Sequence, residues 1–385
     1  MNEPAEWMRL RKGLQAQLPE MLRTLKAFVT AESPSSEKAA ADACAKVIAA
    51  EWKKRSVVVE ALELKHRGAH LRITREAAGG KARGQLLVLG HYDTVYASGT
   101  LARMPYRESG GRVLGPGVFD MKAGIVQALF ALDAIERSGA QPGKKLVFLW
   151  TSDEEIGSES SRRLLESEAK RSDAVFVMEP SLGPKGLLKT ARKGVGEAEI
   201  VVHGRASHAG LAPEKGINAI HELALQIARI RDWNDLGRGV SVNAGIVDGG
   251  TRSNVIPDRA RAVLDLRALR TVDLHKIEKR LCALKPILPG AKLEVRGGFS
   301  RLPLERQHSA ALYEHARNLG QRMGLHIGEA TAGGGSDGNF TAALGVPTLD
   351  GLGAVGDGAH SPGENIRAQA MPERAALLAA LLLTS

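Results

Sequence analysis

Imidazole and carboxylate side chains follow three apolar runs of this sequence. His91 and Asp93 come directly after the run LLVLG. Glu154 and Glu155 follow KLVFLWTSD, and Glu179 follows AVFVM. Ligands of open α/β sheets bind beyond the carboxyl ends of the strands, so three neighbouring parallel strands would bring these side chains to one edge of a sheet.

Two further candidates lie in glycine-containing loops, Asp120 in GPGVFDMKAG and His360 in GDGAHSPGEN. Any one of these groups alone is more often an ordinary loop residue or a helix cap. Together, two imidazoles and several carboxylates at one edge would repel and lose solvation unless cations neutralised them. The pattern therefore predicts a metal centre.

The ligand types indicate which metal is bound. Cys44 and Cys282 are far apart and lack Cys-x-x-Cys spacing, so neither a disulfide framework nor a thiolate site is expected. Imidazole with carboxylate fits zinc and would tolerate cobalt or manganese. One tetrahedral zinc with an open position cannot use five side chains, whereas two zinc ions about 3.5–4 Å apart that share a carboxylate can. The five are His91, Asp120, Glu155, Glu179 and His360.

The surrounding elements must hold these groups. Up to residue 192, apolar runs alternate with helical periodicity, which predicts an α/β domain with a mostly parallel mixed sheet flanked by helices. Residues 193–300 change to a strand-helix-strand-strand-helix-strand order, typical of a ferredoxin-like α+β unit. The first pattern resumes over 301–385. We therefore expect a catalytic domain of 1–192 and 301–385 with 193–300 inserted.

Composition limits the class of protein. The 385 residues are 43% hydrophobic and carry a net charge of +10, which suits acidic small molecules, nucleic acid or simply solubility. Scattered Lys and Arg, 4% aromatic residues and no recognisable motif argue against nucleic acid. No apolar run reaches the ~18 residues of a membrane span, and residues 1–29 lack the apolar core of a signal peptide. We expect a cytoplasmic protein, although a mature exported chain without its signal would look the same.

Nine segments of the chain resemble, in order and spacing, a family of co-catalytic zinc carboxypeptidases and deacylases. That family includes glutamate carboxypeptidases of the carboxypeptidase G type, acetylornithine deacetylase and succinyl-diaminopimelate desuccinylase. The segments are GHYDTVY, GPGVFDMKAG, TSDEEIGS, MEPS, GRASHAG, SNVIP, LDLR, GGGSDGNF and GAHSPGENI. The resemblance covers nearly the whole chain and is strongest to the glutamate carboxypeptidases.

The resemblance implies a role for each metal-site residue. Asp120 would bridge two zinc ions, His91 and Glu179 would complete one site, and Glu155 and His360 would complete the other. It also implies a cis peptide bond between Asp120 and Met121.

Two more residues near the metals receive roles from the resemblance. Glu154 would be the general base, because an unliganded carboxylate beside a metal-activated water can take its proton and pass it to the leaving nitrogen. Asp93 would orient the His91 imidazole from behind. The alternative for Asp93 is the cap of a turn.

The inserted domain resembles the lid and dimerisation module of the family. His208 would reach the active site of the partner subunit and hold the oxyanion. Asn254, Arg267 and Arg301 match positions that bind the terminal carboxylate of the substrate or settle the lid. Backbone N–H groups around Gly335, in GGGSDGNF, would receive a carboxylate, the alternative being an ordinary glycine-rich turn.

These expectations define a homodimeric zinc-dependent hydrolase with two zinc ions per subunit. It would cleave an amide bond beside a free carboxylate in a small acidic peptide or N-acyl amino acid, releasing a C-terminal amino acid, with glutamate the leading candidate. The nearest alternative is an N-acyl-amino-acid deacylase or dipeptidase. A binding protein without turnover is a rival from another class, and we expect neither a nucleic-acid nor a membrane partner.

Overall fold

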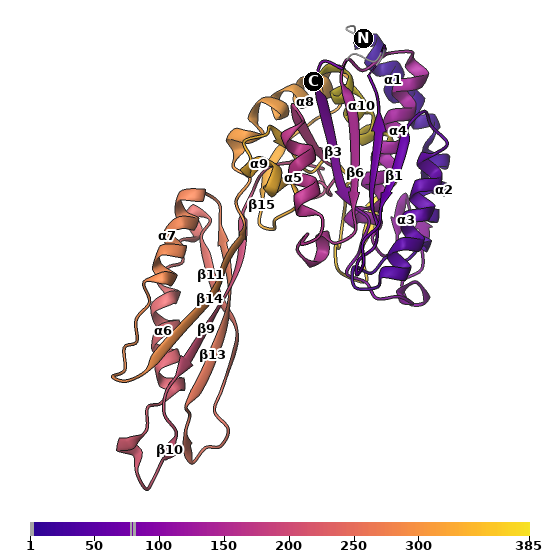
Figure 1. Ribbon diagram of the computed structural model, residues 1–385. Coiled ribbons are helices and arrows are strands. Elements are labelled where there is room, and N and C mark those ends of the chain that lie inside the picture. The colour runs from indigo at the N-terminus through magenta and orange to yellow at the C-terminus, as the bar shows by residue number, and fades with distance from the viewer. Residues whose placement is uncertain (1–3, 78, 80–81) are drawn as a thin grey trace. The chain divides into compact units, whose positions relative to one another are not determined.

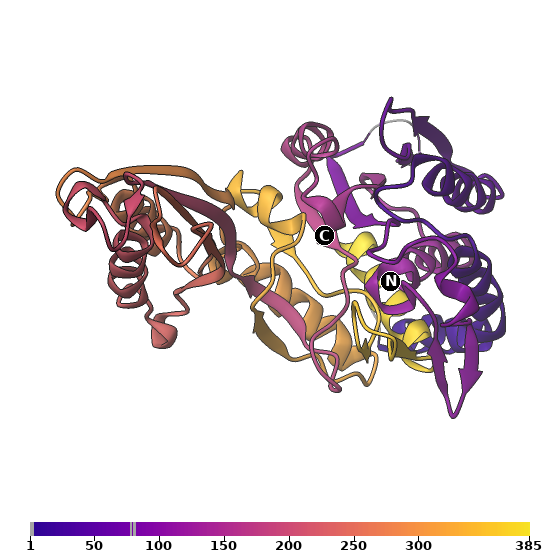
Figure 2. The same cartoon turned by 90° about the horizontal axis from the view of Figure 1, so that it is seen from below.

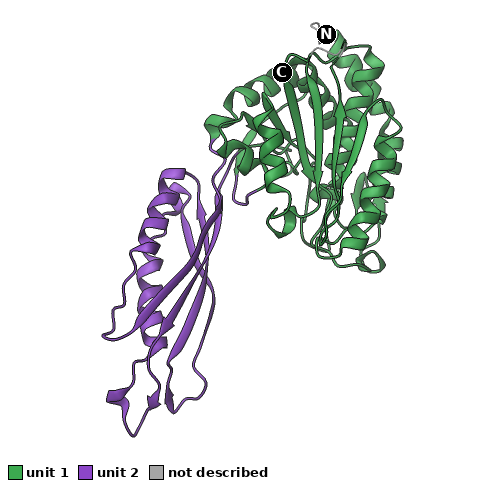
Figure 3. Ribbon diagram, viewed as in Figure 1, with its two compact units in different colours: residues 1–190, 306–331, 336–385 green, residues 191–305, 332–335 purple. Residues whose placement is uncertain are grey.

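The computed structural model describes residues 4–77, 79 and 82–385, which form two compact units (Figure 3). Unit 1 holds the described residues up to Thr190 with Arg306–Thr331 and Ser336–Ser385, and unit 2 holds Ala191–Glu305 and Ala332–Gly335. The sequence pattern places 191–192, 301–305 and 332–335 in the catalytic domain. These residues cluster with unit 2 instead, and backbone hydrogen bonds join their segments, from Arg192 N to Leu304 O at 2.9 Å and from Lys193 N to Ala332 O at 3.2 Å.

The central sheet of unit 1 has six strands in the order β1-β2-β6-β3-β7-β16. Their bounds are Val58–Leu62, His70–Arg75, Lys145–Thr151, Gln85–His91, Ala174–Val177 and Thr348–Leu349. The pairs from β6 to β16 are parallel, and β1 and β2 are antiparallel to their neighbours. Every residue of β3 and β7 is buried, as expected for parallel strands that are covered on both faces.

Helices cover both faces of this sheet (Figure 1). Leu86 and Val88 belong to the core cluster that most of the helices share, whereas Leu87 and Leu89 pack with α5 and α9 on the other face. The bounds of α1, α2, α3, α4, α5, α8, α9 and α10 are Pro4–Ala16, Leu18–Thr30, Lys38–Trp52, Ala123–Ser138, Arg162–Lys170, Ala310–Arg322, Gly338–Ala343 and Ala370–Thr384. In the described part of the chain, no helix is long and apolar enough to cross a membrane.

Two small sheets are separate from the central sheet of unit 1. The first has the order β17-β18-β5-β4, and the second pairs β15 with β8. The bounds of β4, β5, β17 and β18 are Arg107–Ser109, Arg112–Leu114, Gly356–Asp357 and Asn365–Arg367, and those of β8 and β15 are Leu188–Arg192 and Glu329–Ala332. The first small sheet brings the segment before Asp120 next to the segment after His360, because β5 pairs with β18.

Unit 2 has its own four-stranded antiparallel sheet, in the order β11-β13-β9-β14. Helices α6 and α7 pack on one face of it and close a separate core (Figure 1 and Figure 2). The bounds of β9, α6, β11, β13, α7 and β14 are Gly194–His203, Ala219–Arg231, Ser241–Gly249, Arg259–Ala268, Thr271–Cys282 and Lys292–Arg301. Short strands β10 (Ser207–His208) and β12 (Val255–Ile256) pair with each other. Alternate residues of β13 are buried, so one sheet face meets the helices and the other stays partly exposed.

Candidate active site

Three adjacent parallel strands of unit 1 end at the candidate site. His91 is the last residue of β3, and Glu179 lies two residues after β7. Glu154 and Glu155 begin a short 3₁₀ turn, Glu154–Ile156, that follows β6. Since β6, β3 and β7 are neighbours in the sheet, their carboxyl ends bring these side chains to one edge.

Asp120 joins two groups of side chains there. His91 Nε2 lies 3.3 Å from Asp120 Oδ1 and 3.4 Å from Glu179 Oε1. His360 Nε2 lies 3.4 Å from Asp120 Oδ2 and 3.1 Å from Glu155 Oε2. Each group offers three donor atoms within 4.8 Å of one another, and the two oxygens of Asp120 face different imidazoles. We call these groups the His91 triad (His91, Asp120, Glu179) and the His360 triad (Asp120, Glu155, His360).

The donor set fits a divalent metal. Asp120 Oδ1 is buried and accepts no hydrogen bond, although a buried acceptor without a donor is costly. The two triads contain imidazole nitrogens and carboxylate oxygens and no sulfur, the combination that zinc, cobalt and manganese accept. A cation between the side chains would satisfy Asp120 Oδ1 and balance the carboxylates.

Without a cation, the imidazoles provide the positive charge. Burial lowers the pKa of His91, but the adjacent carboxylates of Asp120, Asp93 and Glu179 outweigh this and raise the pKa well above 6.5. Hydrogen bonds to Asp120 and Glu155 raise the pKa of His360 to about 10. Metal binding at these ring nitrogens therefore competes with protons.

The pKa values of the two carboxyl groups in the His360 triad shift in opposite directions. Burial raises the pKa of Asp120, but the two imidazoles outweigh it and hold that pKa far below its usual range. Burial raises the pKa of Glu155, although His360 opposes the shift.

Asp120 and His360 both lie in uncommon backbone conformations. Asp120 lies in the turn Val118–Lys122 just before α4, and its peptide bond to Met121 is cis, as the resemblance implies. His360 has a φ of 60°, in the left-handed region that few residues other than glycine adopt.

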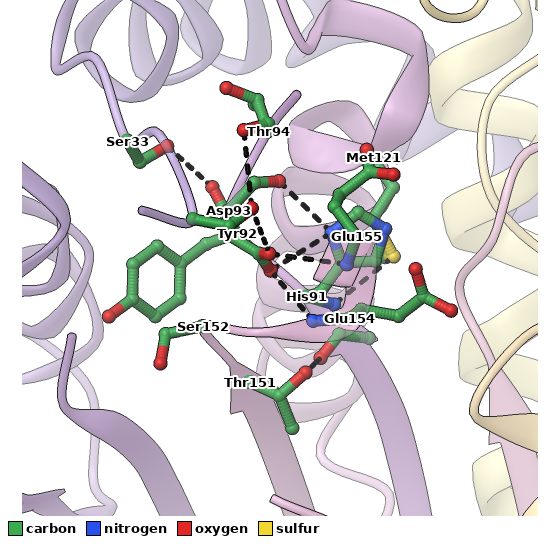
Figure 4. Close-up of polar contacts among 12 residues, drawn as sticks. Ser33, His91, Tyr92, Asp93, Thr94, Met121, Thr151, Ser152, Glu154 and Glu155 are labelled. Carbon is green, nitrogen blue, oxygen red and sulfur yellow. Dashed lines mark hydrogen bonds and ion pairs between the residues drawn. The ribbon is translucent and has the colours of Figure 1, made fainter. Parts of the chain in front are cut away.

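Asp93 is completely buried behind His91 (Figure 4). Its Oδ1 lies 3.4 Å from His91 Nδ1, while its own backbone oxygen is nearer to that nitrogen, at 3.0 Å. Its carboxylate also accepts hydrogen bonds from the backbone N–H groups of Glu154 and Glu155, both at 3.3 Å, and from Ser35 Oγ at 2.7 Å. Asp93 therefore contacts the imidazole and holds the turn that carries the two glutamates.

Two candidates lie together in unit 2. His208 is exposed on β10, and its Nδ1 accepts hydrogen bonds from the backbone N–H groups of Gly210 and Leu211, both at 3.1 Å. The Nε2 atom of the neutral ring therefore carries the proton. Asn254 is exposed in the neighbouring segment, and its backbone oxygen accepts from Ala209 N at 2.9 Å.

The other substrate-binding candidates are spread over unit 2. The Arg267 guanidinium donates to both oxygens of Asp265, two residues earlier on the partly exposed face of β13, at 2.9 and 2.7 Å. Arg301 ends β14 and is buried. The backbone oxygen of Gly335 accepts from Arg192 Nη1 at 3.1 Å.

Glu364, four residues after His360, is a buried residue of the site that no sequence pattern predicts. Its side chain is fully buried and accepts the backbone N–H groups of Gly117, Phe119 and Asp120. The only signal was its place in the segment GAHSPGENI, which does not distinguish a ligand from a backbone acceptor.

Another residue that the sequence analysis did not single out is Arg374, on α10. It is buried and donates to the backbone oxygens of Leu352 and Gly353, at 3.2 and 3.1 Å. Gly353 N in turn donates to Glu179 O at 2.9 Å, so Arg374 supports the backbone of a candidate ligand.

Comparisons with known proteins show the family of this chain. Residues 87–384 match peptidase family M20/M25/M40. Carboxypeptidase G2 of Pseudomonas sp. (strain RS-16) is 30% identical over 376 residues, 95% of this chain and 89% of that protein. Succinyl-diaminopimelate desuccinylase of Ectopseudomonas mendocina (strain ymp) is 27% identical over 303 residues, 74% of this chain and 78% of that protein.

A solved structure shows the same fold. The aminopeptidase PepT from Bacillus cereus ATCC 10987 matches with a TM-score of 0.78 at 21% identity, covering 96% of this chain and 98% of that one. The predicted resemblance to the carboxypeptidase and deacylase family is confirmed by the sequence matches. The chain therefore belongs to peptidase family M20/M25/M40, and it is a metal-dependent hydrolase.

Proposed function

We propose that this hydrolase is a glutamate carboxypeptidase-like metallopeptidase. It cleaves an amide bond beside a free carboxylate and releases a C-terminal amino acid, with glutamate the leading candidate. The observation that carries the proposal is the pair of triads joined at Asp120, with the non-ligand Glu154 next to Glu155. The similarity to carboxypeptidase G2 along nearly the whole chain supports the choice of leaving group.

In this proposal two zinc ions occupy the site, and cobalt or manganese can replace them. The His91 triad would hold one ion and the His360 triad the other, with Asp120 belonging to both groups. When bound, the ions would lower the pKa of a water molecule and polarise the carbonyl of the scissile bond. Asp93 orients the His91 ring and fixes the turn of the two glutamates.

Glu154 moves the proton. Its carboxylate takes a proton from the attacking water and delivers it to the leaving nitrogen, so that the amine departs neutral. Because Glu154 N donates to the buried Asp93, the backbone beneath this carboxylate is fixed. Glu154 can therefore act as a base while the adjacent Glu155 acts as a ligand.

Unit 2 acts as a ferredoxin-like lid and dimerisation module in this proposal, and the protein is a homodimer. Its strand order and helix-covered face suit such a module. His208 donates from Nε2 to the oxyanion in the partner subunit, which the hydrogen bonds to its Nδ1 support. Edge strand β11 exposes Ile246 and Val247, which a second copy could cover.

Four positions of unit 2 receive the carboxylate of the substrate or settle the lid in this proposal. They are Asn254, Arg267, Arg301 and the backbone around Gly335. An arginine can bind a carboxylate through two parallel hydrogen bonds. Arg267 would have to exchange its pairing with Asp265 for the substrate, so it suits this role only if the substrate displaces that contact.

A deacylase that releases an amino acid from an N-acyl group, or a dipeptidase, is the second candidate. The 27% identity to succinyl-diaminopimelate desuccinylase supports it. Both candidates use the same metal site and proton transfer, and both need a free carboxylate near the scissile amide. The group on the acyl side of the scissile amide and the side chain of the released amino acid together distinguish them.

A substrate screen tests the proposal. The protein is stripped with a chelator, reloaded with zinc, cobalt or manganese, and given N-acyl amino acids and dipeptides that vary on both sides of the amide. We expect the reloaded protein, and not the stripped protein, to release glutamate with the highest kcat/KM. Preference for another amino acid would favour the deacylase or dipeptidase. Absence of hydrolysis in every metal-loaded sample would contradict both.

A further inference from the structure

Glu364 is a buried carboxylate that lies between the two loops of the metal site. Its side chain is 0% exposed. Glu364 Oε1 accepts from Phe119 N at 2.8 Å and from Asp120 N at 2.9 Å, and Oε2 accepts from Gly117 N at 3.0 Å. Neither triad contains Glu364, so it contacts the backbone of a candidate ligand without sharing the ligand role.

The three N–H groups belong to one tight turn. Gly117 has a φ of 71°, and the chain then bends through Val118–Lys122 into α4. Buried backbone donors need acceptors, and in this turn one carboxylate serves three of them. Because Asp120 N is among them, the position of Glu364 fixes the backbone from which the shared ligand extends.

Glu364 also belongs to the loop that carries His360. Its backbone N donates to Ser361 O at 3.1 Å, and Ser361 O also accepts from Tyr96 Oη at 3.0 Å. Its backbone O accepts from Gly115 N at 3.4 Å, where β18 pairs with β5. The residue therefore connects the loop after β17 to the turn before α4.

The surroundings of the carboxyl group match this connecting role. Burial raises the pKa of Glu364, whereas the hydrogen bonds from the backbone N–H groups of Asp120, Gly117 and Phe119 oppose the shift. Both oxygens of the carboxyl group accept backbone hydrogen bonds, Oε1 from two N–H groups and Oε2 from one. Asp93 does the same for the turn of Glu154 and Glu155, so two buried non-ligand carboxylates hold the two ligand-bearing turns.

We propose that Glu364 is a positioning residue for the metal site. It sets the Asp120 turn relative to the loop of His360, so the affinity and geometry of the paired site depend on a side chain that binds no metal. This inference rests on the proposed function of the two triads as a two-metal centre. Partners outside the ligand set change metal affinity by about 10–100-fold in known metal sites.

Two substitutions separate position from charge. Glu364→Gln keeps one acceptor oxygen but places an amide N–H₂ against a backbone donor. Glu364→Asp keeps the charge but withdraws the carboxylate by one methylene. If position matters, both variants bind metal about 10–100-fold more weakly than the parent.

The matched control is Glu222→Gln in unit 2. Glu222 is also 0% exposed and also accepts backbone N–H groups from one loop, those of Ile287 at 3.1 Å and Leu288 at 2.6 Å. Its loss should destabilise the protein to a similar extent, read from thermal unfolding, and should leave metal binding at the parental level.

The measurement is metal binding itself. Stripped full-length protein is titrated with zinc against a chromophoric chelator, and the visible absorption of the cobalt-loaded protein reports coordination geometry. We expect weaker binding and a changed cobalt spectrum for both Glu364 variants, and parental values for Glu222→Gln.

Three results would overturn the inference. The first is parental metal affinity and a parental cobalt spectrum in both Glu364 variants. The second is parental metal binding in Glu364→Asp alone, which would assign the effect to the charge of the side chain. The third is equally weakened metal binding in Glu222→Gln, which would assign the effect to general stability. A parent protein that binds no divalent metal would overturn the proposed function itself.

Discussion

Two neighbouring glutamates have different surroundings in the turn after β6. Glu155 lies 3.1 Å from His360 Nε2, whereas Glu154 belongs to neither triad. Glu154→Gln should therefore remove a proton acceptor and leave the ligands intact. We expect kcat to fall by about 10²–10⁴-fold, the usual contribution of a general acid or base, with metal content unchanged by elemental analysis.

Glu159→Gln is the control for this variant, because Glu159 is exposed in the same loop. It should keep the parental kcat. A Glu154→Gln protein with full activity would assign the base to another group, and one that loses metal would make Glu154 a ligand.

His70 provides a prediction about pH. This imidazole is 2% exposed at the start of β2, and its Nδ1 accepts from Ser152 N at 3.3 Å. Burial lowers the pKa of His70 below its usual 6.5. Above that pH the ring is neutral in both states. Below it the unfolded chain binds a proton that the folded chain does not, so the free energy of unfolding decreases as the pH falls.

The His70→Asn variant keeps a hydrogen-bond acceptor and loses the titrating group. In metal-free protein, its free energy of unfolding should decrease less than that of the parent between about pH 7.5 and pH 5.5, by at most about 1.4 kcal/mol per pH unit. Urea unfolding at each pH measures the two slopes. Equal slopes would show that the proton on His70 has no part in acid sensitivity.

The sequence identifies residues that extend from strand ends better than residues that support them. His91, Glu155 and Glu179 follow apolar runs, so their meeting point can be inferred once the strands are taken as parallel. Glu364 follows no such run. Its carboxylate accepts hydrogen bonds from backbone N–H groups more than 240 positions earlier in the chain, and its sequence separation from Asp120 is 244 residues. The contact between these distant parts of the chain is visible only in the folded structure.

At the scale of elements, close backbone contacts set where α4 begins. A Cβ on Gly124, in the first turn of α4, would lie 2.3 Å from the carbonyl oxygen of Met178, the residue before Glu179. Glycine at this position therefore lets the helix approach the end of β7. Gly13, in α1, has no atom within 4 Å of its Cβ position.

These two glycines give opposite predictions for the same substitution. Gly124→Ala should lower the free energy of unfolding by about 1–3 kcal/mol or more, because the backbone oxygen of Met178 cannot move aside easily. Gly13→Ala should raise it by about 0.5–1 kcal/mol, because alanine favours the helix. Urea unfolding of both variants tests the pair, and a stabilised Gly124→Ala protein would contradict the packing argument.

Long elements of this chain are easier to predict than short ones. The apolar runs of β3 and β6 and the periodicity of α4 indicate their structure directly. The strands β4, β5, β17 and β18 have only two or three residues each, too few for a period to show. Yet their sheet brings Glu364 beneath the Asp120 turn, so a part of the site depends on elements that the sequence does not reveal.

At the scale of the whole molecule, the chain divides into units with separate cores. The core of unit 2 contains residues of β9, β13, α6 and α7 and none of unit 1. The six residues proposed for metal binding and proton transfer lie in unit 1, and His208 lies in unit 2. If His208 serves the partner subunit, one active site needs residues from two chains.

Mixing two inactive variants tests this arrangement. Glu154→Gln lacks the proposed base, and His208→Ala, which removes the proposed oxyanion donor, should lose about 10²–10³-fold in kcat. A mixed dimer contains one site with an intact Glu154 and an intact His208 from the other chain. When equal amounts of the two variants exchange subunits, half of the dimers are mixed, and each mixed dimer has one complete site out of two. About a quarter of all sites are then complete, so about a quarter of the parental activity should return.

The matched mixture is Glu154→Gln with Glu155→Gln. Both substitutions lie in the same turn of unit 1, so no exchange of subunits can assemble a complete site, and no activity should return. Differently sized tags on the two chains report the formation of mixed dimers independently of activity. If mixed dimers form and the His208→Ala mixture stays inactive, His208 does not act across the interface, and each chain must supply its own oxyanion donor.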